Sequence, residues 1–145
     1  MPQPKSIQIE RYFNAQPDAV WRAWTDPAIV SRWFGSDPAG KVLAAQLDVR
    51  SGGRFEVSFR DSSGIEHTCR GVYVEVEPGS KLSFSWSWRS EPGIESLVAV
   101  RLKPEGEGTL MQFEHARLVD GSAHDYAAGW RRTFEKLASV LSVKS

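Results

Sequence analysis

The chain has 145 residues, of which 41% are hydrophobic and 25% charged, so it is large enough for one globular domain with a sizeable core. Lys and Arg number 18, as do Asp and Glu, and this neutral balance argues against binding to nucleic acid or to an anionic lipid surface through charge. The single cysteine excludes an internal disulfide, and no apolar run is long enough for a secretion signal or a membrane span, so we expect one cytoplasmic domain over residues 1–145.

The first third of the chain predicts a strand followed by two short helices. Residues 6–13 alternate between apolar and polar side chains, as a strand does. Pro17 marks the start of the first helix, because proline is well suited to a first helical position. Asp26 can cap a second helix that begins at Pro27 and ends at Gly35.

From residue 42 onward the hydrophobic period changes to two, which is typical of half-buried antiparallel strands. Short turns rich in glycine, proline, serine and aspartate separate the apolar runs. We expect six strands here, near residues 43–47, 54–60, 68–76, 81–89, 97–102 and 109–115. With the first strand, this gives a sheet of six to seven strands.

Two of these strands carry the strongest patterns. Residues 81–89 alternate serines with an apolar set consisting of Leu82, Phe84, Trp86 and Trp88. In residues 68–76, strict alternation places three valines on one face, namely Val72, Val74 and Val76. The opposite face of that strand then holds Cys69, Gly71 and Tyr73.

A long helix is expected over residues 122–141, with Ser122 as its cap. At about 100° per residue, one narrow stripe contains Tyr126, Trp130, Phe134, Leu137 and Leu141. The aromatic face of the sheet has no second sheet to cover it, and this stripe has no other long helix to pack on. We therefore predict an α+β fold in which a curved antiparallel sheet wraps the C-terminal helix, leaving space near one end.

Several short motifs in order resemble a known family. They are Val20-Trp-Arg-Ala-Trp-Thr-Asp-Pro, Arg32-Trp-Phe-Gly, Gly52-Gly-Arg-Phe, Gly71-Val-Tyr-Val-Glu-Val-Glu-Pro, Leu82-Ser-Phe-Ser-Trp, Gly108-Thr, His115, and Gly129-Trp130 with Leu137 and Leu141. Together, over roughly residues 6–141, the chain resembles the bacterial homologues of the C-terminal domain of the activator of the heat-shock-protein-90 ATPase, within the START-like (SRPBCC, birch-pollen-allergen-like) superfamily. The resemblance implies the helix-grip fold, with two short helices closing one end and a cavity between the sheet and the C-terminal helix. Residues 36–40 depart from the usual Trp-Gly-Pro run of the family.

The resemblance implies a range of functions. Members of the superfamily bind lipids, sterols or hormones, cyclise polyketides, or act as co-chaperones in the stress response. We expect non-catalytic binding of a small hydrophobic or amphipathic ligand in the cavity. The alternatives are a co-chaperone or other protein-interaction module, with a chaperone partner, and a polyketide-cyclase-like enzyme.

The expected cavity residues are mostly aromatic, and plain core packing is the alternative for each of them. The apolar walls would be Trp33, Phe34, Phe55, Phe59, Trp86, Trp88, Phe113, Trp130 and Phe134. His115 is the expected polar anchor, with a satisfied core histidine as the alternative, and Tyr73 and Arg101 are weaker polar candidates. Trp21 and Trp24 are expected to pack the short helices on the sheet.

No catalytic, metal or cofactor site is predicted. His67 and Cys69 alternate on one strand and could join His115 as metal ligands, but no acidic side chain is placed beside them. Ser-His-Asp and Cys-His spacings are not evident in the sequence. Gly52-Gly53 has no following helix or lysine and therefore predicts a turn, not a phosphate-binding loop. The pattern does not determine the oligomeric state.

Overall fold

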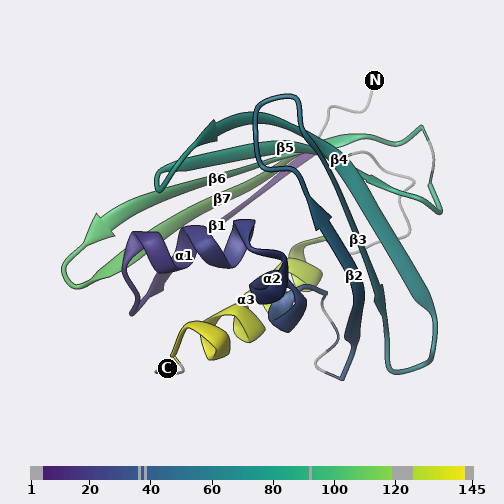
Figure 1. Cartoon of the computed structure of the whole chain (residues 1–145), viewed down its shortest axis with the longest axis horizontal. Helices are drawn as coiled ribbons and strands as arrows, with labels where there is room; N and C mark the ends of the chain where they lie inside the picture. Colours follow the sequence, from purple (N-terminus) through teal and green to yellow (C-terminus); the bar gives the residue numbers. More distant parts are fainter. Residues whose placement is uncertain (1–4, 36, 38, 92, 119–125, 143–145) are drawn as a thin grey trace.

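The computed structural model describes residues 5–35, 37, 39–91, 93–118 and 126–142. Within these ranges the elements are β1 (Lys5–Phe13), α1 (Pro17–Thr25), α2 (Pro27–Trp33), β2 (Lys41–Leu47), β3 (Arg54–Arg60), β4 (Glu66–Glu77), β5 (Lys81–Trp88), β6 (Ser96–Glu105), β7 (Gly108–Leu118) and α3 (Tyr126–Ser142). The seven strands form one antiparallel sheet in the order β1-β7-β6-β5-β4-β3-β2. The sheet curves, and all three helices lie on its concave side (Figure 1). The predicted α+β helix-grip architecture is confirmed.

The two short helices begin as the sequence predicts. Asp26 caps α2, because its Oδ1 accepts a hydrogen bond from the backbone N–H of Ala28 at 2.9 Å. Gln16 precedes α1 without a side-chain cap, and its amide instead donates to the carbonyl of Glu107 at 3.2 Å. Gly35 follows α2 with a φ of +98°, a conformation that glycine adopts at little cost. The predicted cap of α3, Ser122, lies outside the described residues.

Strand β4 departs from strict alternation. The register with β5 shifts between Tyr73 and Glu75, which marks a β-bulge. Val72 and Val74 are exposed, but Val76 lies opposite Leu82 and packs against the core. The prediction that all three valines share one face is therefore wrong, because the extra residue in the bulge reverses the alternation after it.

The core forms where α3 and α1 meet the sheet. Trp130, Phe134 and Leu137 of α3 are buried, as the predicted stripe requires. The ring centre of Trp130 lies 4.6 Å from that of Phe113 on β7. Trp24 of α1 joins them, with its ring centre 6.1 Å from Phe134. Among the described helices, none combines the length and apolar character needed to cross a membrane.

Candidate functional site

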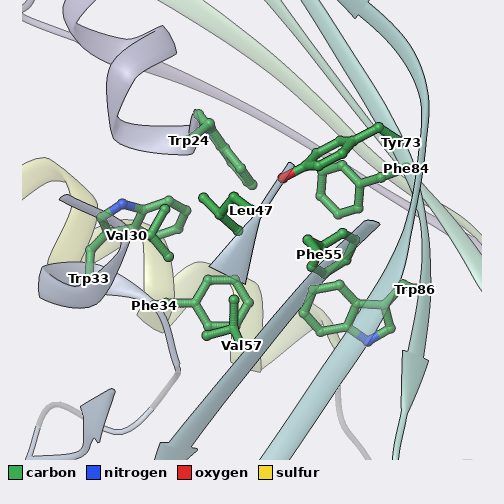
Figure 2. Close-up of a pocket in the computed structure, with 10 residues that line it drawn as sticks. All are labelled: Trp24, Val30, Trp33, Phe34, Leu47, Phe55, Val57, Tyr73, Phe84 and Trp86. Carbon is green, nitrogen blue, oxygen red and sulfur yellow. The ribbon is translucent and has the colours of Figure 1, made fainter. Parts of the chain in front are cut away.

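An apolar pocket lies between the two short helices and strands β2–β5 (Figure 2). Its walls come from every element around it: Trp24, Val30, Trp33, Phe34, Leu47, Phe55, Val57, Tyr73, Phe84 and Trp86. Nine of these side chains are buried, and Leu47 is partly exposed on the edge strand β2. The pocket is therefore closed except on the side of Leu47.

The pocket is nearly filled by its own walls. Its volume is about 20 Å³, which is close to the space that one water molecule needs and far below the ~300–1,000 Å³ of typical small-molecule sites. Ring contacts explain the small volume: Phe34 lies 5.9 Å from Trp86, and Phe55 lies 5.0 Å from Phe84, centre to centre. This pocket differs from the expected open cavity beside the C-terminal helix. The pocket is small and lies against α1 and α2.

Tyr73 supplies a polar atom to this apolar wall. Its side chain comes from β4, opposite Phe84, and is 3% exposed. The hydroxyl points into the pocket, toward Trp24 and Leu47 (Figure 2). Among the described residues, none forms a hydrogen bond with it. Burial, together with the nearby Asp48 carboxylate, raises the pKa of the Tyr73 hydroxyl, which therefore stays protonated at neutral pH.

The three indoles in the wall differ in their hydrogen bonding. Trp33 donates from Nε1 to the carbonyl of Ala23 at 2.8 Å, which ties α2 to α1. The Nε1 atoms of Trp24 and Trp86 are buried and have no partner among the described residues. Figure 2 shows the nitrogen of Trp86 on the ring edge away from Tyr73. The pocket thus has more buried donors than acceptors.

His115 lies deeper in the core, outside the pocket lining, in a network of its own. It is fully buried on β7, and its Nδ1 accepts a hydrogen bond from Trp130 Nε1 at 2.9 Å. Its Nε2 lies 2.6 Å from Ser96 Oγ, and Ser96 donates to the carbonyl of Trp86 at 3.4 Å. Both ring nitrogens therefore have partners from this protein.

This network determines the protonation of His115. An indole N–H can only donate, so Nδ1 must be unprotonated, and the proton of the neutral ring resides on Nε2, where it is donated to Ser96. Burial lowers the pKa of His115 from 6.5 to about 3. A neutral histidine with both nitrogens bonded is better suited to hold Trp130 in place than to exchange protons with a ligand.

The predicted wall residues separate into two groups. Five of the predicted side chains line the pocket: Trp33, Phe34, Phe55, Tyr73 and Trp86. Six lie elsewhere in the core: Phe59, Trp88, Phe113, His115, Trp130 and Phe134. Of these, Phe59 and Trp88 contact one another at 5.9 Å, and Trp88 donates to the hydroxyl of Tyr126 at 2.8 Å.

Sequence reasoning missed half of the lining, namely Trp24, Val30, Leu47, Val57 and Phe84. Trp24 was assigned to packing, and it does pack on Trp33 at 4.9 Å, yet the same ring borders the pocket. Leu47 and Val57 both occupy inward positions of predicted strands. That alternation was the available signal, but it does not reveal which inward residues adjoin a pocket.

The side chains considered above as metal ligands, those of His67, Cys69 and His115, do not form a metal site among the described residues. Cys69 is fully buried, and burial raises the pKa of its thiol. His67 is half-buried, and its Nε2 lies 3.0 Å from Asp61 Oδ2, a contact that lowers the pKa of the Asp61 carboxyl. Across the described residues, no three His, Cys, Asp or Glu side chains form a group that could hold a metal ion.

The rim beside the pocket is held by Lys136 of α3. Its ammonium group donates to three carbonyls after α2, those of Phe34, Gly35 and Asp37, at 3.1–3.4 Å. The Asp37 carboxylate accepts from the backbone N–H and the hydroxyl of Ser62 at 2.9 and 2.7 Å. These bonds lower the pKa of Asp37 to about 2. The segment after α2 is thus tied both to α3 and to the turn between β3 and β4.

A larger hollow, of about 630 Å³, lies on the opposite, solvent-facing side of the sheet. Arg101, weighed above as an interior polar candidate, lies here and is exposed. Other polar groups of this surface bond to each other across the strands: Gln112 to Glu10, Gln8 to Glu114 and Lys81 to Glu75. Much of the bonding capacity of this surface is used within the sheet, so the buried pocket is the better candidate.

A protein family and several solved structures are similar to this chain over most of its length. The family described as "Activator of Hsp90 ATPase homolog 1-like protein" matches residues 14–142. CalU16 from Micromonospora echinospora is 31% identical, with a TM-score of 0.73 over 96% of this chain and 77% of that chain. No curated protein sequence matches.

Two further solved structures share the fold. The protein CV1439 from Chromobacterium violaceum is 22% identical, with a TM-score of 0.84 over 97% of this chain and 99% of that chain. The AHSA1-like protein from Aeromonas hydrophila is 24% identical, with a TM-score of 0.78 over 94% of this chain and 91% of that chain. At these identities the likeness concerns the fold alone.

Proposed function

Since the chain belongs to the family of activator of Hsp90 ATPase homolog 1-like proteins, we propose that it binds a small hydrophobic or amphipathic molecule, without converting it, in the pocket between α1, α2 and strands β2–β5. The observation that carries the proposal is the pocket itself, whose ten wall residues are almost entirely apolar and mostly aromatic. Such walls, with a few placed polar groups, are characteristic of small-molecule sites.

The small volume reflects the energetic cost of keeping an apolar pocket open. An empty apolar cavity costs about 24 cal/mol per Å³, so 300 Å³ of empty space would cost about 7 kcal/mol. That is a large share of the ~5–15 kcal/mol that stabilises a domain. An unoccupied pocket is therefore expected to collapse, and a ligand must reopen it. Leu47 marks the side of entry, because it is the partly exposed wall residue and lies on an edge strand.

Binding is favoured over catalysis by the composition of the wall. Tyr73 is the single titratable side chain among the ten lining residues, and its raised pKa makes it a poor base at neutral pH. General acid–base catalysis needs a group that gains and loses a proton near the working pH. His115, the other candidate, has both nitrogens engaged and a pKa lowered to about 3.

A titration with toluene tests the proposal. Binding is monitored through the indole N–H signals in a ¹H–¹⁵N spectrum. We expect saturable shifts of the Trp24 and Trp33 signals, because both rings line the pocket. The matched control is Leu47→Trp, which places a larger side chain at the entry side and should abolish the shifts. If the wild-type signals do not move up to the solubility limit of toluene, the pocket does not open and the proposal fails. Native mass spectrometry of the purified protein then searches for the natural ligand.

A co-chaperone role is the second candidate, favoured by the family description and by the close packing of the pocket. It predicts that adding the protein raises the ATPase rate of a heat-shock protein 90. The Leu47→Trp variant distinguishes the two functions, because stimulation through a protein surface should persist when the pocket is filled. If the wild-type protein leaves the ATPase rate unchanged, this second function fails.

A further inference from the structure

The hydroxyl of Tyr73 has no role in the folded chain by itself. The ring packs between Phe55 and Phe84, at 5.5 and 5.9 Å between centres, and a phenylalanine would make the same contacts. The hydroxyl, in contrast, forms no hydrogen bond with another described residue, although it is not among the fully buried unpaired atoms. It therefore keeps a hydrogen-bond donor available at the pocket, and a guest from outside the chain can supply the acceptor.

The direction of the hydroxyl indicates where that partner would sit. Figure 2 shows the oxygen at the inner end of the ring, facing the space beside Trp24 and Leu47. A guest that enters past Leu47 therefore meets this oxygen inside the pocket. His115, the anchor expected from the sequence, does not line the pocket and is already bonded to Trp130 and Ser96.

The chemistry of the wall limits the kind of partner. The other side-chain polar atoms are indole N–H groups, which only donate: that of Trp33 is engaged with Ala23, and those of Trp24 and Trp86 have no partner among the described residues. The guest must therefore offer an acceptor. A carbonyl or ether oxygen on an apolar body satisfies the hydroxyl and also fills the space.

The charge of the surrounding residues further limits the kind of guest that the pocket can take. None of the ten wall residues is charged, so an ionised guest would lose its hydration without a counter-ion. The Asp48 carboxylate lies near enough to help raise the pKa of Tyr73, and it would repel a carboxylate or phosphate at the same place. The pocket thus disfavours charged guests, anions most of all.

We propose that the pocket takes an uncharged, apolar molecule bearing an oxygen acceptor, such as a ketone or an ester, and that the Tyr73 hydroxyl donates a hydrogen bond to that oxygen. This inference rests on the proposed function, because it assigns the ligand class and the polar anchor of the same pocket. Burial keeps Tyr73 protonated, so its hydroxyl remains a donor at neutral pH.

Two probes of nearly the same shape test the proposal: acetophenone, which carries a carbonyl oxygen, and α-methylstyrene, in which a methylene group replaces that oxygen. Dissociation constants are measured from the indole N–H shifts for the wild type and for Tyr73→Phe. We expect the wild type to bind acetophenone about 5- to 10-fold more tightly than α-methylstyrene, as one additional hydrogen bond would give. The Tyr73→Phe variant should bind both equally and bind α-methylstyrene at least as well as the wild type does.

The control is Tyr12→Phe, which removes the same atom from an exposed tyrosine outside the pocket and should preserve the preference for acetophenone. If the wild type binds both probes equally, or if Tyr73→Phe retains the preference, the anchor is not Tyr73, although the pocket still binds apolar molecules. If neither probe binds the wild type, the proposed function fails and this inference fails with it.

Discussion

Acid should destabilise this protein through one buried group, His115. In the folded chain the imidazole is neutral, because Trp130 donates to its Nδ1 and burial opposes a charge. Its pKa falls from 6.5 to about 3 on folding. Between these values the unfolded chain holds one more proton than the folded chain, so the free energy of unfolding decreases as the pH falls through this window. Above pH 6.5 the histidine is neutral in both states and contributes no pH dependence.

The size of the effect follows from the shift. Each pKa unit corresponds to ~1.4 kcal/mol, so His115 should remove about 2 kcal/mol of stability between pH 7 and pH 5, and about 4 kcal/mol by pH 3. A domain of this kind has ~5–15 kcal/mol in total. The carboxyl groups of Asp37 and Asp61, whose pKa values are lowered in the folded chain, act in the same direction only below their unfolded pKa of 3.8.

Urea unfolding of the wild type and of His115→Gln at pH 7 and pH 5 measures this effect. The glutamine amide can accept from Trp130 and donate to Ser96 but does not titrate, and all other titratable groups are common to both proteins. We expect the wild type to lose about 2 kcal/mol more than the variant between the two pH values. Equal losses would refute the reasoning. Should the variant fail to fold, an NMR titration of His115 in the wild type tests whether its pKa is lowered. A proton on Nδ1 at pH 7 would contradict the assigned tautomer.

Three further predictions concern Trp130, Lys136 and Cys69. Trp130→Ala should cost about 3–5 kcal/mol in urea unfolding, because the indole is closely packed against Phe113 and bonded to His115; a cost under about 1 kcal/mol would mean that the ring borders open space. Lys136→Met should lower stability by about 1–3 kcal/mol and speed amide hydrogen exchange at Gly40, because the three carbonyls after α2 lose their donor; unchanged exchange would show that Lys136 does not hold this segment. Cys69 should resist a thiol reagent in the native protein and react once denaturant is added, because it is buried with a raised pKa; rapid native labelling would contradict its placement.

Local patterns predicted most of the fold. The serine alternation of β5 indicated its buried face, and Leu82, Phe84, Trp86 and Trp88 are indeed buried. Asp26 was predicted as a cap because capping depends on groups two or three residues away. The failure at Val76 has the opposite cause. A bulge is set by the partner strand, and its extra residue leaves no mark in the alternation itself.

The candidate site was only partly predictable. Tyr73 and Trp86 were correctly placed on inward faces, and both line the pocket. The sequence did not distinguish a wall residue from a core residue, because an aromatic ring at an inward position looks the same in either role. Trp24 illustrates this, since it packs on Trp33 and borders the pocket with the same ring.

By itself, then, the sequence determined which side chains face inward and that the aromatic face of the sheet needs the C-terminal helix as its cover, because both follow from periods of two and 3.6 residues along the chain. Only the tertiary structure decided how closely those side chains interlock and which polar atoms meet. Ser96 and His115 are 19 positions apart and Trp130 lies 15 beyond, yet their contacts turn the expected anchor into a bonded core residue. The unpaired hydroxyl that remains is that of Tyr73. Hydrogen bonds and cavity volumes change when distant segments shift relative to each other by tenths of an ångström. A residue pattern does not specify positions to that precision.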